Sequence, residues 1–424
     1  MSAPSWRSDP SITFVLVGYS SWTLGHLDAV LPPGSVLILE EPDVIASRDV
    51  LAGASAHRCF GRLEPAPIHD EQNARTRSSE YVRPPNARAV IAAVDYGVVW
   101  AAQLAESWAL VGAGAEAARS FRDKARLREA ADAGGIRQPL WRIATELSQV
   151  VEFAVAHPGG VVIKPSNLQA SVGVRLVDDV ADLRSAWEET LRAGEPRYRA
   201  RSATPPRFLV ETRLRGSEVS VETFVRAGVP IFTNVTRKVV QDGPYPVELG
   251  HVVPAADLRS GTSERLEQSV AQLVAATGIQ TAVLHSEWML DGAETPFLIE
   301  CAARIPGDGI DQLISLAYGF DFVNTWVSLM LGDEFAPIPA STGSAVVKYF
   351  RTAATSEQVE RLDAALSSRV FEFGVKPLDD GEGGIRDSSD RNGYVITVAA
   401  TATAAIESAE TATREILTAL GHHE

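Results

Sequence analysis

The sequence predicts a multidomain protein that combines α/β and α+β architecture. Near the N-terminus, apolar runs at residues 12–18, 36–40 and 88–94 alternate with polar segments, which is typical of an α/β domain. In the middle, residues 281–302 alternate in polarity around a turn signal, as an antiparallel hairpin does. Residues 341–424 follow a strand–helix–strand–strand–helix order, which predicts a small α+β unit.

The composition narrows the classes of function. The chain has 424 residues, enough for two to four domains, and it is 45% hydrophobic and 22% charged, as globular proteins are. Its net charge of −15 argues against nucleic acid or an anionic membrane as the main partner. Two cysteines, Cys59 and Cys301, form no disulfide framework, and residues 1–10 lack a signal-peptide core. No apolar run approaches the length of a membrane span, so we expect a cytoplasmic protein.

The segment 281–311 carries the strongest chemical signal. Asp291-Gly292 marks a turn, and side chains two apart on a strand share one face. A turn closing around residues 293–294 places Glu287 opposite Glu300. Two opposed carboxylates repel each other, and a divalent cation resolves the conflict; oxygen ligands favour Mg²⁺ or Mn²⁺ over Zn²⁺. The alternative is a solvated strand pair with ordinary surface acids.

These residues also carry a family resemblance. Glu287, then Glu300 in the motif ECAAR, then Arg304 resembles the metal-binding signature of ATP-grasp carboxylate–amine ligases. The chain is most similar to the bacterial L-amino acid ligase (dipeptide synthetase) branch, whose second motif reads E-S-A-A-R. Many ATP-grasp enzymes have Asn where this chain has Ala302, and that departure matches the dipeptide-forming branch.

The resemblance implies an ATP-grasp fold with flanking domains. We expect an N-terminal α/β domain at 1–115, a small lid subdomain at 116–203, a large subdomain with the metal site at 204–336, and a C-terminal α+β lobe at 337–424. No catalytic residue is expected in the C-terminal lobe.

The resemblance also implies a set of phosphate-binding residues. Lys124, on a helix expected at 119–133, and Lys164, at a strand end, would bind phosphate. The alternative for each is a solvated lysine, and without the family context we favour that alternative for Lys124 only. Ser171 lies in the loop that closes over the phosphates, which is glycine-rich in the family but retains only Gly173 here. Lys238 or its neighbour Arg237 would face the triphosphate, and we favour Lys238.

Further residues are expected to bind the nucleoside and the substrate. Glu211 and the backbone around Leu214 would meet adenine, and Glu218 would accept hydrogen bonds from ribose. A lone histidine is more often structural, but His251 belongs to a Glu-x-Gly-His stretch like that beside the substrate pocket of the amino acid ligases. The remaining substrate residues expected are Glu248, Arg304, Gly307 and Asp308, with Asp308 attracting a cationic or amino-bearing substrate.

The function implied is an ATP-dependent ligase that forms an amide or peptide bond through an acyl phosphate and releases ADP. Catalysis would rest on Arg304, Lys164 and Lys238, with ATP and two Mg²⁺ or Mn²⁺ ions. The partners would be a small carboxylate and an amine, neither nucleic acid nor membrane, and a homodimer is expected. The alternatives are another ATP-grasp reaction, such as phosphorylation or carboxylation, and a non-catalytic nucleotide-binding protein.

Overall fold

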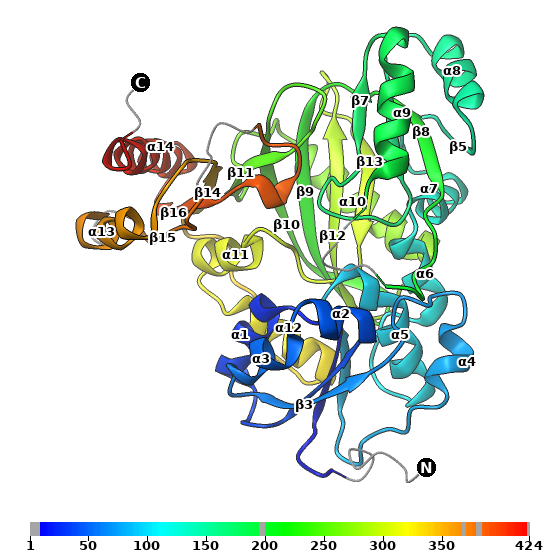
Figure 1. Ribbon diagram of the computed structural model, residues 1–424, viewed down its shortest axis with the longest axis vertical. Coiled ribbons are helices and arrows are strands. Elements are labelled where there is room, and N and C mark those ends of the chain that lie inside the picture. Colours follow the sequence, from blue (N-terminus) through cyan, green and yellow to red (C-terminus); the bar gives the residue numbers. More distant parts are fainter. Residues whose placement is uncertain (1–8, 195–199, 367–369, 379–383, 422–424) are drawn as a thin grey trace.

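The computed structural model describes residues 9–194, 200–366, 370–378 and 384–421. Three sheets organise these residues, and helices cover them (Figure 1). The mixture of helices and strands confirms the predicted multidomain α/β and α+β class. Residues 195–199, which precede the predicted boundary at 203/204, lie outside the described residues.

The N-terminal region is a parallel four-stranded sheet in the order β3-β2-β1-β4. The three apolar runs expected as strands form β1, β2 and β4, and they are buried throughout. Strand β3 and four short helices were not predicted. The elements are β1 (Phe14–Val17), α1 (Ser21–Val30), β2 (Val36–Glu40), α2 (Pro42–Ser47), α3 (Val50–Ser55), β3 (Phe60–Pro65), α4 (Ala74–Ser78), β4 (Ala89–Ala92) and α5 (Val98–Ser107).

Two helices lead out of this region where one was expected. The predicted helix at 119–133 is interrupted at Asp123, whose backbone is extended (φ −120°, ψ 113°). Its carboxylate accepts hydrogen bonds from the backbone N–H groups of Ala125 and Arg126, which caps a new helix that begins at Lys124. The two helices are α6 (Ala115–Arg122) and α7 (Lys124–Ala133).

The small sheet has the order β5-β8-β6-β7, with all pairs antiparallel. The predicted boundary at 203/204 assigns β8 to the large subdomain, but β8 pairs with both β5 and β6. That boundary is therefore wrong, and the small unit extends to Thr212. Its elements are β5 (Trp141–Ala144), α8 (Leu147–Ala156), β6 (Val161–Pro165), β7 (Arg175–Val177), α9 (Leu183–Arg192) and β8 (Phe208–Thr212).

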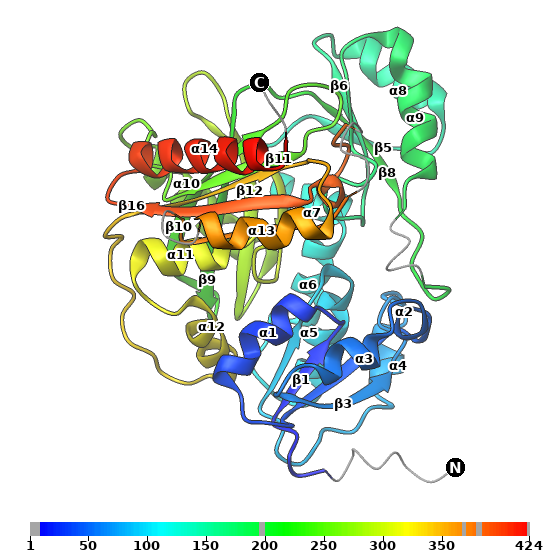
Figure 2. The same cartoon turned by 60° about the vertical axis from the view of Figure 1, so that its left-hand side comes forward.

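The large sheet is antiparallel, in the order β13-β12-β9-β10-β11-β14-β16-β15. The C-terminal segment has the predicted element order, but its strands continue this sheet beside β11 and do not form a separate lobe. Helices α13 and α14 run alongside β16 (Figure 2). The elements are β9 (Ser217–Arg226), β10 (Val229–Val240), β11 (Glu248–Val253), α10 (Thr262–Thr277), β12 (Ala282–Leu290), β13 (Pro296–Ala302), α11 (Ile310–Tyr318), α12 (Phe322–Leu331), β14 (Ser344–Phe350), α13 (Ser356–Leu366), β15 (Glu372–Val375), β16 (Gly393–Ala399) and α14 (Ala402–Ala419).

The apolar segment after the central hairpin forms two helices, α11 and α12. Gly319 adopts a left-handed conformation (φ 70°) that ends α11, and the side chain of Asp321 caps α12. In the described ranges no single helix is long and apolar enough to cross a membrane. The pair α11 and α12 meets that test together by length and composition only, and the two helices are bent by 105°.

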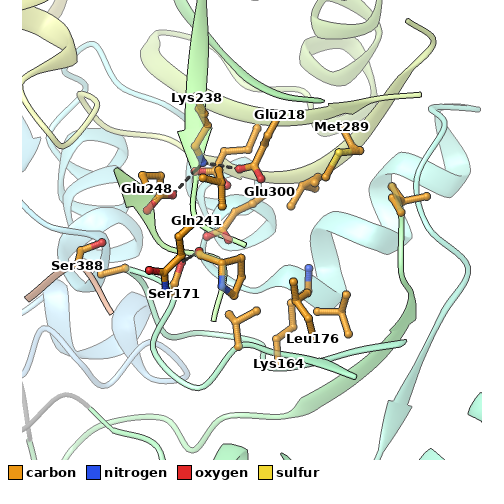
Figure 3. Close-up of a pocket in the computed structure, with 18 of the residues that line it drawn as sticks. Lys164, Ser171, Leu176, Glu218, Lys238, Gln241, Glu248, Met289, Glu300 and Ser388 are labelled. Atoms are coloured by element: carbon orange, nitrogen blue, oxygen red, sulfur yellow. Dashed lines mark hydrogen bonds and ion pairs between the residues drawn. The ribbon is translucent and has the colours of Figure 1, made fainter. Parts of the chain in front are cut away.

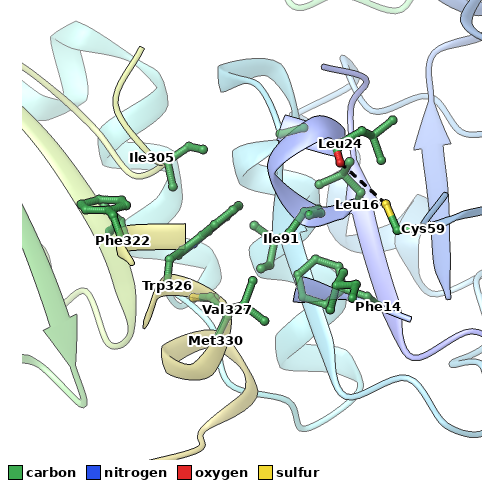
Figure 4. Close-up of a cluster of buried hydrophobic side chains, with 14 of the residues drawn as sticks. Phe14, Leu16, Leu24, Cys59, Ile91, Ile305, Phe322, Trp326, Val327 and Met330 are labelled. Carbon is green, nitrogen blue, oxygen red and sulfur yellow. Dashed lines mark hydrogen bonds between the residues drawn. The ribbon is translucent and has the colours of Figure 1, made fainter. Parts of the chain in front are cut away.

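A shared hydrophobic core joins the N-terminal sheet to the large sheet. Phe14 and Leu16 of β1 belong to the same buried cluster as Trp326 of α12 and Val347 of β14 (Figure 4). Trp326 is 2% exposed. Because Trp326 is buried between the N-terminal sheet and the large sheet, its packing contributes to the stability of both.

We predict that Trp326→Ala lowers the free energy of unfolding by about 3 to 5 kcal/mol, because it leaves a cavity between two regions of the chain. Guanidinium unfolding followed by far-ultraviolet circular dichroism measures the change. Trp22→Ala is the control, since Trp22 is 47% exposed and its loss should cost about 0.5 kcal/mol or less. Equal shifts in the two variants would contradict the role assigned to this core.

Candidate active site

A cavity of about 750 Å³ lies between the small sheet, the large sheet and the turn that follows β13. Every residue predicted to bind nucleotide, metal or substrate lines this cavity, including residues far apart in the sequence. Their roles remain predictions, but the chain brings all of them to one place. They are Lys124, Lys164, Ser171, Glu211, Leu214, Glu218, Lys238, Glu248, His251, Glu287, Glu300, Arg304, Gly307 and Asp308.

Glu287 and Glu300 are direct partners across β12 and β13, as the hairpin register predicted. Each of the two carboxylates is paired with a lysine. Lys238 Nζ lies 3.0 Å from Glu287 Oε1, and Lys124 Nζ lies 3.0 Å from Glu300 Oε1. Lys124 also donates a hydrogen bond of 2.6 Å to the carbonyl of Leu168, in the loop after β6. The expected repulsion between the two acids is thus offset by two ammonium groups.

Lys238 stands among three carboxylates from three neighbouring strands (Figure 3). Its Nζ lies 2.6 Å from Glu218, 2.9 Å from Glu248 and 3.0 Å from Glu287. Burial opposes the charge on Lys238, but the three carboxylates raise its pKa well above the ordinary value. Negative charge is in excess here, and burial together with the neighbouring acids raises the pKa of Glu218.

The structure distinguishes Lys238 from its neighbour Arg237. The guanidinium of Arg237 pairs with Asp257 at 2.9 Å, and it does not reach the carboxylates around Lys238. Arg237 contributes only to the cavity wall. The favoured residue, Lys238, is therefore the one placed among the acids.

His285 extends the charged cluster, and it was not predicted as a site residue. Its ring lies 3.0 Å from Glu222 and 3.4 Å from Glu287. Burial opposes protonation, but the two carboxylates raise the pKa of His285 to about 9. Glu222 is fully buried and accepts further hydrogen bonds from Ser220, Asn234 and Thr236. The alternation on β12, which places His285 on the face of Glu287, was a signal that could have identified it.

A buried ion-pair cluster joins the small sheet to the edge of the large sheet. Arg128 binds both carboxylate oxygens of Glu211, at 2.8 and 3.1 Å, and donates to the carbonyls of Leu298 and Ile299 on β13. Lys164 Nζ lies 2.8 Å from the same carboxylate. Although burial opposes ionisation, the two cations lower the pKa of Glu211 to about 2. Both oxygens of Glu211 are engaged by these two cations, and the predicted contact of Glu211 with adenine stays a prediction.

Arg128 was also missed in the sequence. It lies four residues after Lys124 on α7, so both side chains occupy the same face of the helix, and that spacing was an available signal. Its buried guanidinium ties α7, β8 and β13 together.

The phosphate loop after β6 is fixed by contacts that do not depend on glycine. Ala170 and Ser171 both adopt left-handed backbone conformations, with φ of 54° and 60°. The hydroxyl of Ser171 donates to the carbonyl of Pro246, and Leu176 N–H donates to the carbonyl of Pro244. The loop is thereby tied to the segment between β10 and β11.

Two residues predicted at the substrate end already have partners within the chain. The guanidinium of Arg304 binds both oxygens of Asp95, at 2.8 and 3.1 Å. The carboxylate of Asp308 binds Arg391 and His251. Burial opposes ionisation of Asp308, and these two partners nevertheless hold its pKa well below the usual range. The roles of Arg304 and Asp308 toward a substrate stay predictions.

The C-terminal segment, from which no catalytic residue is expected, contributes to the wall of the cavity. Ser388 lines the cavity, and Arg391 bonds to Asp308, 83 positions earlier in the chain.

Asp95, the partner of Arg304, could have been predicted as a residue of the site from the sequence. It follows β4 at the carboxyl edge of a parallel sheet, where ligands commonly bind. No local pattern marks Arg391.

The acids fit a divalent cation that takes further ligands from elsewhere. Among the residues that the structure describes, no group of three or more His, Cys, Asp or Glu side chains is arranged to hold a metal ion alone. Glu287 and Glu300 offer two carboxylates in a region of excess negative charge. Mg²⁺ bound by two carboxylates completes its octahedron with phosphate oxygens and water.

Comparison with known protein families identifies one domain in the middle of the chain. Residues 157–312 match the ATP-grasp domain family, so the chain contains this domain, and the predicted resemblance is confirmed. ATP-grasp enzymes in general use ATP and divalent metal ions.

Individual relatives agree with this assignment. The structure is similar to that of the L-amino acid ligase from Bacillus licheniformis, with a TM-score of 0.73, 18% identity, and coverage of 96% of this chain and 98% of the other. It is also similar to carboxyaminoimidazole ribonucleotide synthase from Aspergillus clavatus complexed with ATP, with a TM-score of 0.68, 14% identity, and coverage of 97% and 99%.

In sequence, the alanine–anticapsin ligase of Bacillus subtilis (strain 168) is 24% identical over 257 residues, which is 56% of this chain. The match spans about half of that ligase, 52% of its length. The relatives named here are ligases or synthases, which supports the predicted enzyme class.

We predict that Arg128→Met lowers the free energy of unfolding by about 3 to 5 kcal/mol, because it leaves the buried Glu211 with one cation fewer. Thermal unfolding measures the change. The matched control is Arg126→Met, an exposed arginine on the same helix, which should have little effect. Adding Glu211→Gln to Arg128→Met should recover part of the loss, and a purely additive double variant would contradict the pairing.

Proposed function

We propose that this protein is an ATP-dependent carboxylate–amine ligase that forms an amide or peptide bond and releases ADP and phosphate. The observation that carries the proposal is the opposed pair of Glu287 and Glu300, each neutralised by a lysine, within one cavity that also holds Lys164 and Arg304. The proposed substrates are amino acids or related small carboxylic acids, as the resemblance to amino acid ligases suggests.

The proposed reaction has two steps. An oxygen of the substrate carboxylate attacks the γ-phosphorus of ATP, and the bond from that phosphorus to the bridging oxygen breaks, giving an acyl phosphate and ADP. The amine nitrogen then attacks the acyl carbon, the carbon–oxygen bond to phosphate breaks, and the nitrogen loses a proton. Phosphate leaves and the amide remains.

The residues of the chain have distinct parts in this scheme. Lys124 and Lys164 neutralise phosphate charge, and exchanging Glu300 or Glu211 for phosphate brings their ammonium groups to the nucleotide. Arg304, oriented by Asp95, stabilises the negative charge that develops on the acyl group. One or two Mg²⁺ or Mn²⁺ ions held by Glu287 and Glu300 would supply further charge neutralisation at the phosphates. The loop around Ser171 excludes water from the acyl phosphate.

A second candidate is another ATP-grasp reaction, phosphorylation or carboxylation without amide formation. The similarity to carboxyaminoimidazole ribonucleotide synthase favours it. A third is a nucleotide-binding protein without catalysis, favoured by the glycine-poor phosphate loop and by Ala302. A cytoplasmic location and a homodimer remain predictions.

Phosphate release should be measured with ATP and Mg²⁺ over a matrix of amino acid pairs, with mass spectrometry of every positive reaction. We predict ADP and a product lighter than the summed substrates by one water. The variant Glu300→Ala should lose turnover by about 100-fold or more, because it removes one of the two acids at the phosphates. Its control is Glu267→Ala, an exposed acid on α10.

The outcomes separate the candidates. ADP without condensation would favour the second candidate, and ATP binding without turnover would favour the third. AMP as a product would contradict the proposed chemistry. Full activity of Glu300→Ala with added Mg²⁺ would refute the metal assignment.

We predict that the lysines make binding of the metal depend on the nucleotide. Without nucleotide, Lys238 and Lys124 occupy the acids, so Mn²⁺ should bind weakly; with ADP it should bind at least about tenfold more tightly. Lys238→Met should tighten Mn²⁺ binding in the absence of nucleotide, because Glu287 loses its ammonium partner. Electron paramagnetic resonance of free Mn²⁺ measures both affinities, with Lys376→Met, an exposed lysine, as the control. Equal Mn²⁺ affinity in the wild type and Lys238→Met would contradict the prediction.

A further inference from the structure

The turn between β13 and α11 holds a residue in a strained conformation at the edge of the cavity. Asp308 has a left-handed backbone (φ 56°), which costs a non-glycine residue about 1 kcal/mol or more. Its carbonyl accepts a hydrogen bond of 2.7 Å from the hydroxyl of Tyr349 on β14. Its carboxylate is bound by His251 at 3.1 Å and by Arg391. Contacts from outside the turn therefore hold Asp308 in this conformation.

Arg391 makes two of the four hydrogen bonds to Asp308 described above, and it is itself held by several contacts. Its guanidinium donates to both oxygens of Asp308, at 2.9 and 2.7 Å, and to the carbonyls of Glu248 and Ser388. It lies 4.1 Å from the ring centroid of Tyr349, as in a cation–π contact. The side chain is 8% exposed. A planar guanidinium fixed at both edges is a rigid element of the structure and not a surface charge.

The cluster formed by Asp308, Arg391 and His251 lies at the substrate end of the cavity that we propose. Asp308, His251, Glu248 and Ser388 all line the cavity together with Arg304. In Figure 3, Glu248 and Ser388 lie on the side away from Lys164 and Leu176, which belong to the small sheet. The cluster thus borders the part of the cavity left for the substrate once a nucleotide lies against the small sheet.

The electrostatic consequence opposes what the sequence suggested. Taken alone, Asp308 would attract a cationic side chain. With Arg391 bound to both of its oxygens, the charge of Asp308 is cancelled, and a fixed positive charge stands directly behind it. At Asp308, a second cation would meet repulsion from Arg391 and find both carboxylate oxygens already engaged.

We propose that Arg391 is a positioning and specificity-determining residue, which makes the substrate end of the cavity accept uncharged side chains and reject basic ones. This rests on the proposed function, since it names the substrate class of the same site. Arg391 acts through Asp308 and the turn that carries Arg304, and the C-terminal segment is therefore part of substrate selection.

The test compares two probes with the same carbon chain, L-lysine and L-norleucine. They differ only in the ammonium group at the end of the lysine side chain. For the wild type, norleucine should be preferred, as a substrate in the amide-forming assay and as a ligand by calorimetry with a non-hydrolysable ATP analogue. In Arg391→Met the carboxylate of Asp308 keeps only His251 as a partner, and the lysine-to-norleucine ratio of kcat/KM should rise by about tenfold or more. The KM for ATP should stay within about twofold of the wild type.

Three further variants separate selectivity from general damage. Arg391→Lys should keep the wild-type ratio, because the positive charge is retained. Adding Asp308→Asn to Arg391→Met should return the ratio toward the wild type. Arg386→Met, an exposed arginine on the same segment, should leave the ratio unchanged.

The inference and the proposed function fail in different ways. An active wild type with the same ratio in Arg391→Met overturns the inference alone. A wild type that binds ATP but forms no amide overturns the proposed function, and the calorimetric ratio then still tests the inference. If Arg391→Met does not fold, Asp308→Asn alone serves: it leaves the charge of Arg391 uncancelled and should lower the ratio further, and an unchanged or higher ratio overturns the inference.

Discussion

The repulsion between Glu287 and Glu300 is the constraint on which the site depends. The hairpin register places the two carboxylates opposite each other, and the chain offsets their charge with its own lysines. Lys124 comes from the start of α7 and Lys238 from β10, so the offset joins separate elements around one point. A site of this kind is stable before any ligand arrives, and phosphate is a natural competitor for its lysines.

Three arginine–carboxylate pairs then hold the walls of the cavity. Arg128 with Glu211 joins the small sheet to β13, Arg304 with Asp95 joins the turn after β13 to the N-terminal sheet, and Arg391 with Asp308 joins that turn to the C-terminal segment. Bidentate guanidinium pairs fix both distance and orientation, which ammonium groups do not. Buried pairs of this kind contribute little net stability, so we attribute their presence to the geometry that they impose.

The features predictable from the sequence were those set by local periodicity. Alternation along β12 and β13 gave the opposition of Glu287 and Glu300, and the apolar runs gave β1, β2 and β4. The wrong or missing predictions concern features that depend on one side chain or on contacts between residues far apart in the sequence. The helix break at Asp123 arises from one capping side chain, and the placement of β8 depends on its pairing with β5 and β6. Arg391 and Asp308 are distant in the chain, and only the addition of β14 and β16 to the large sheet brings them together.

Ala302 and His285 are best understood together. Ala302 stands where many ATP-grasp enzymes have an asparagine ligand, and its partner across the hairpin is His285. With a pKa raised to about 9, His285 is protonated at neutral pH and lies beside Glu287. At this point the chain therefore has an apolar side chain and, opposite it, a cation. Neither group binds a metal ion, so under the proposed function the nucleotide phosphates would supply more of the ligands.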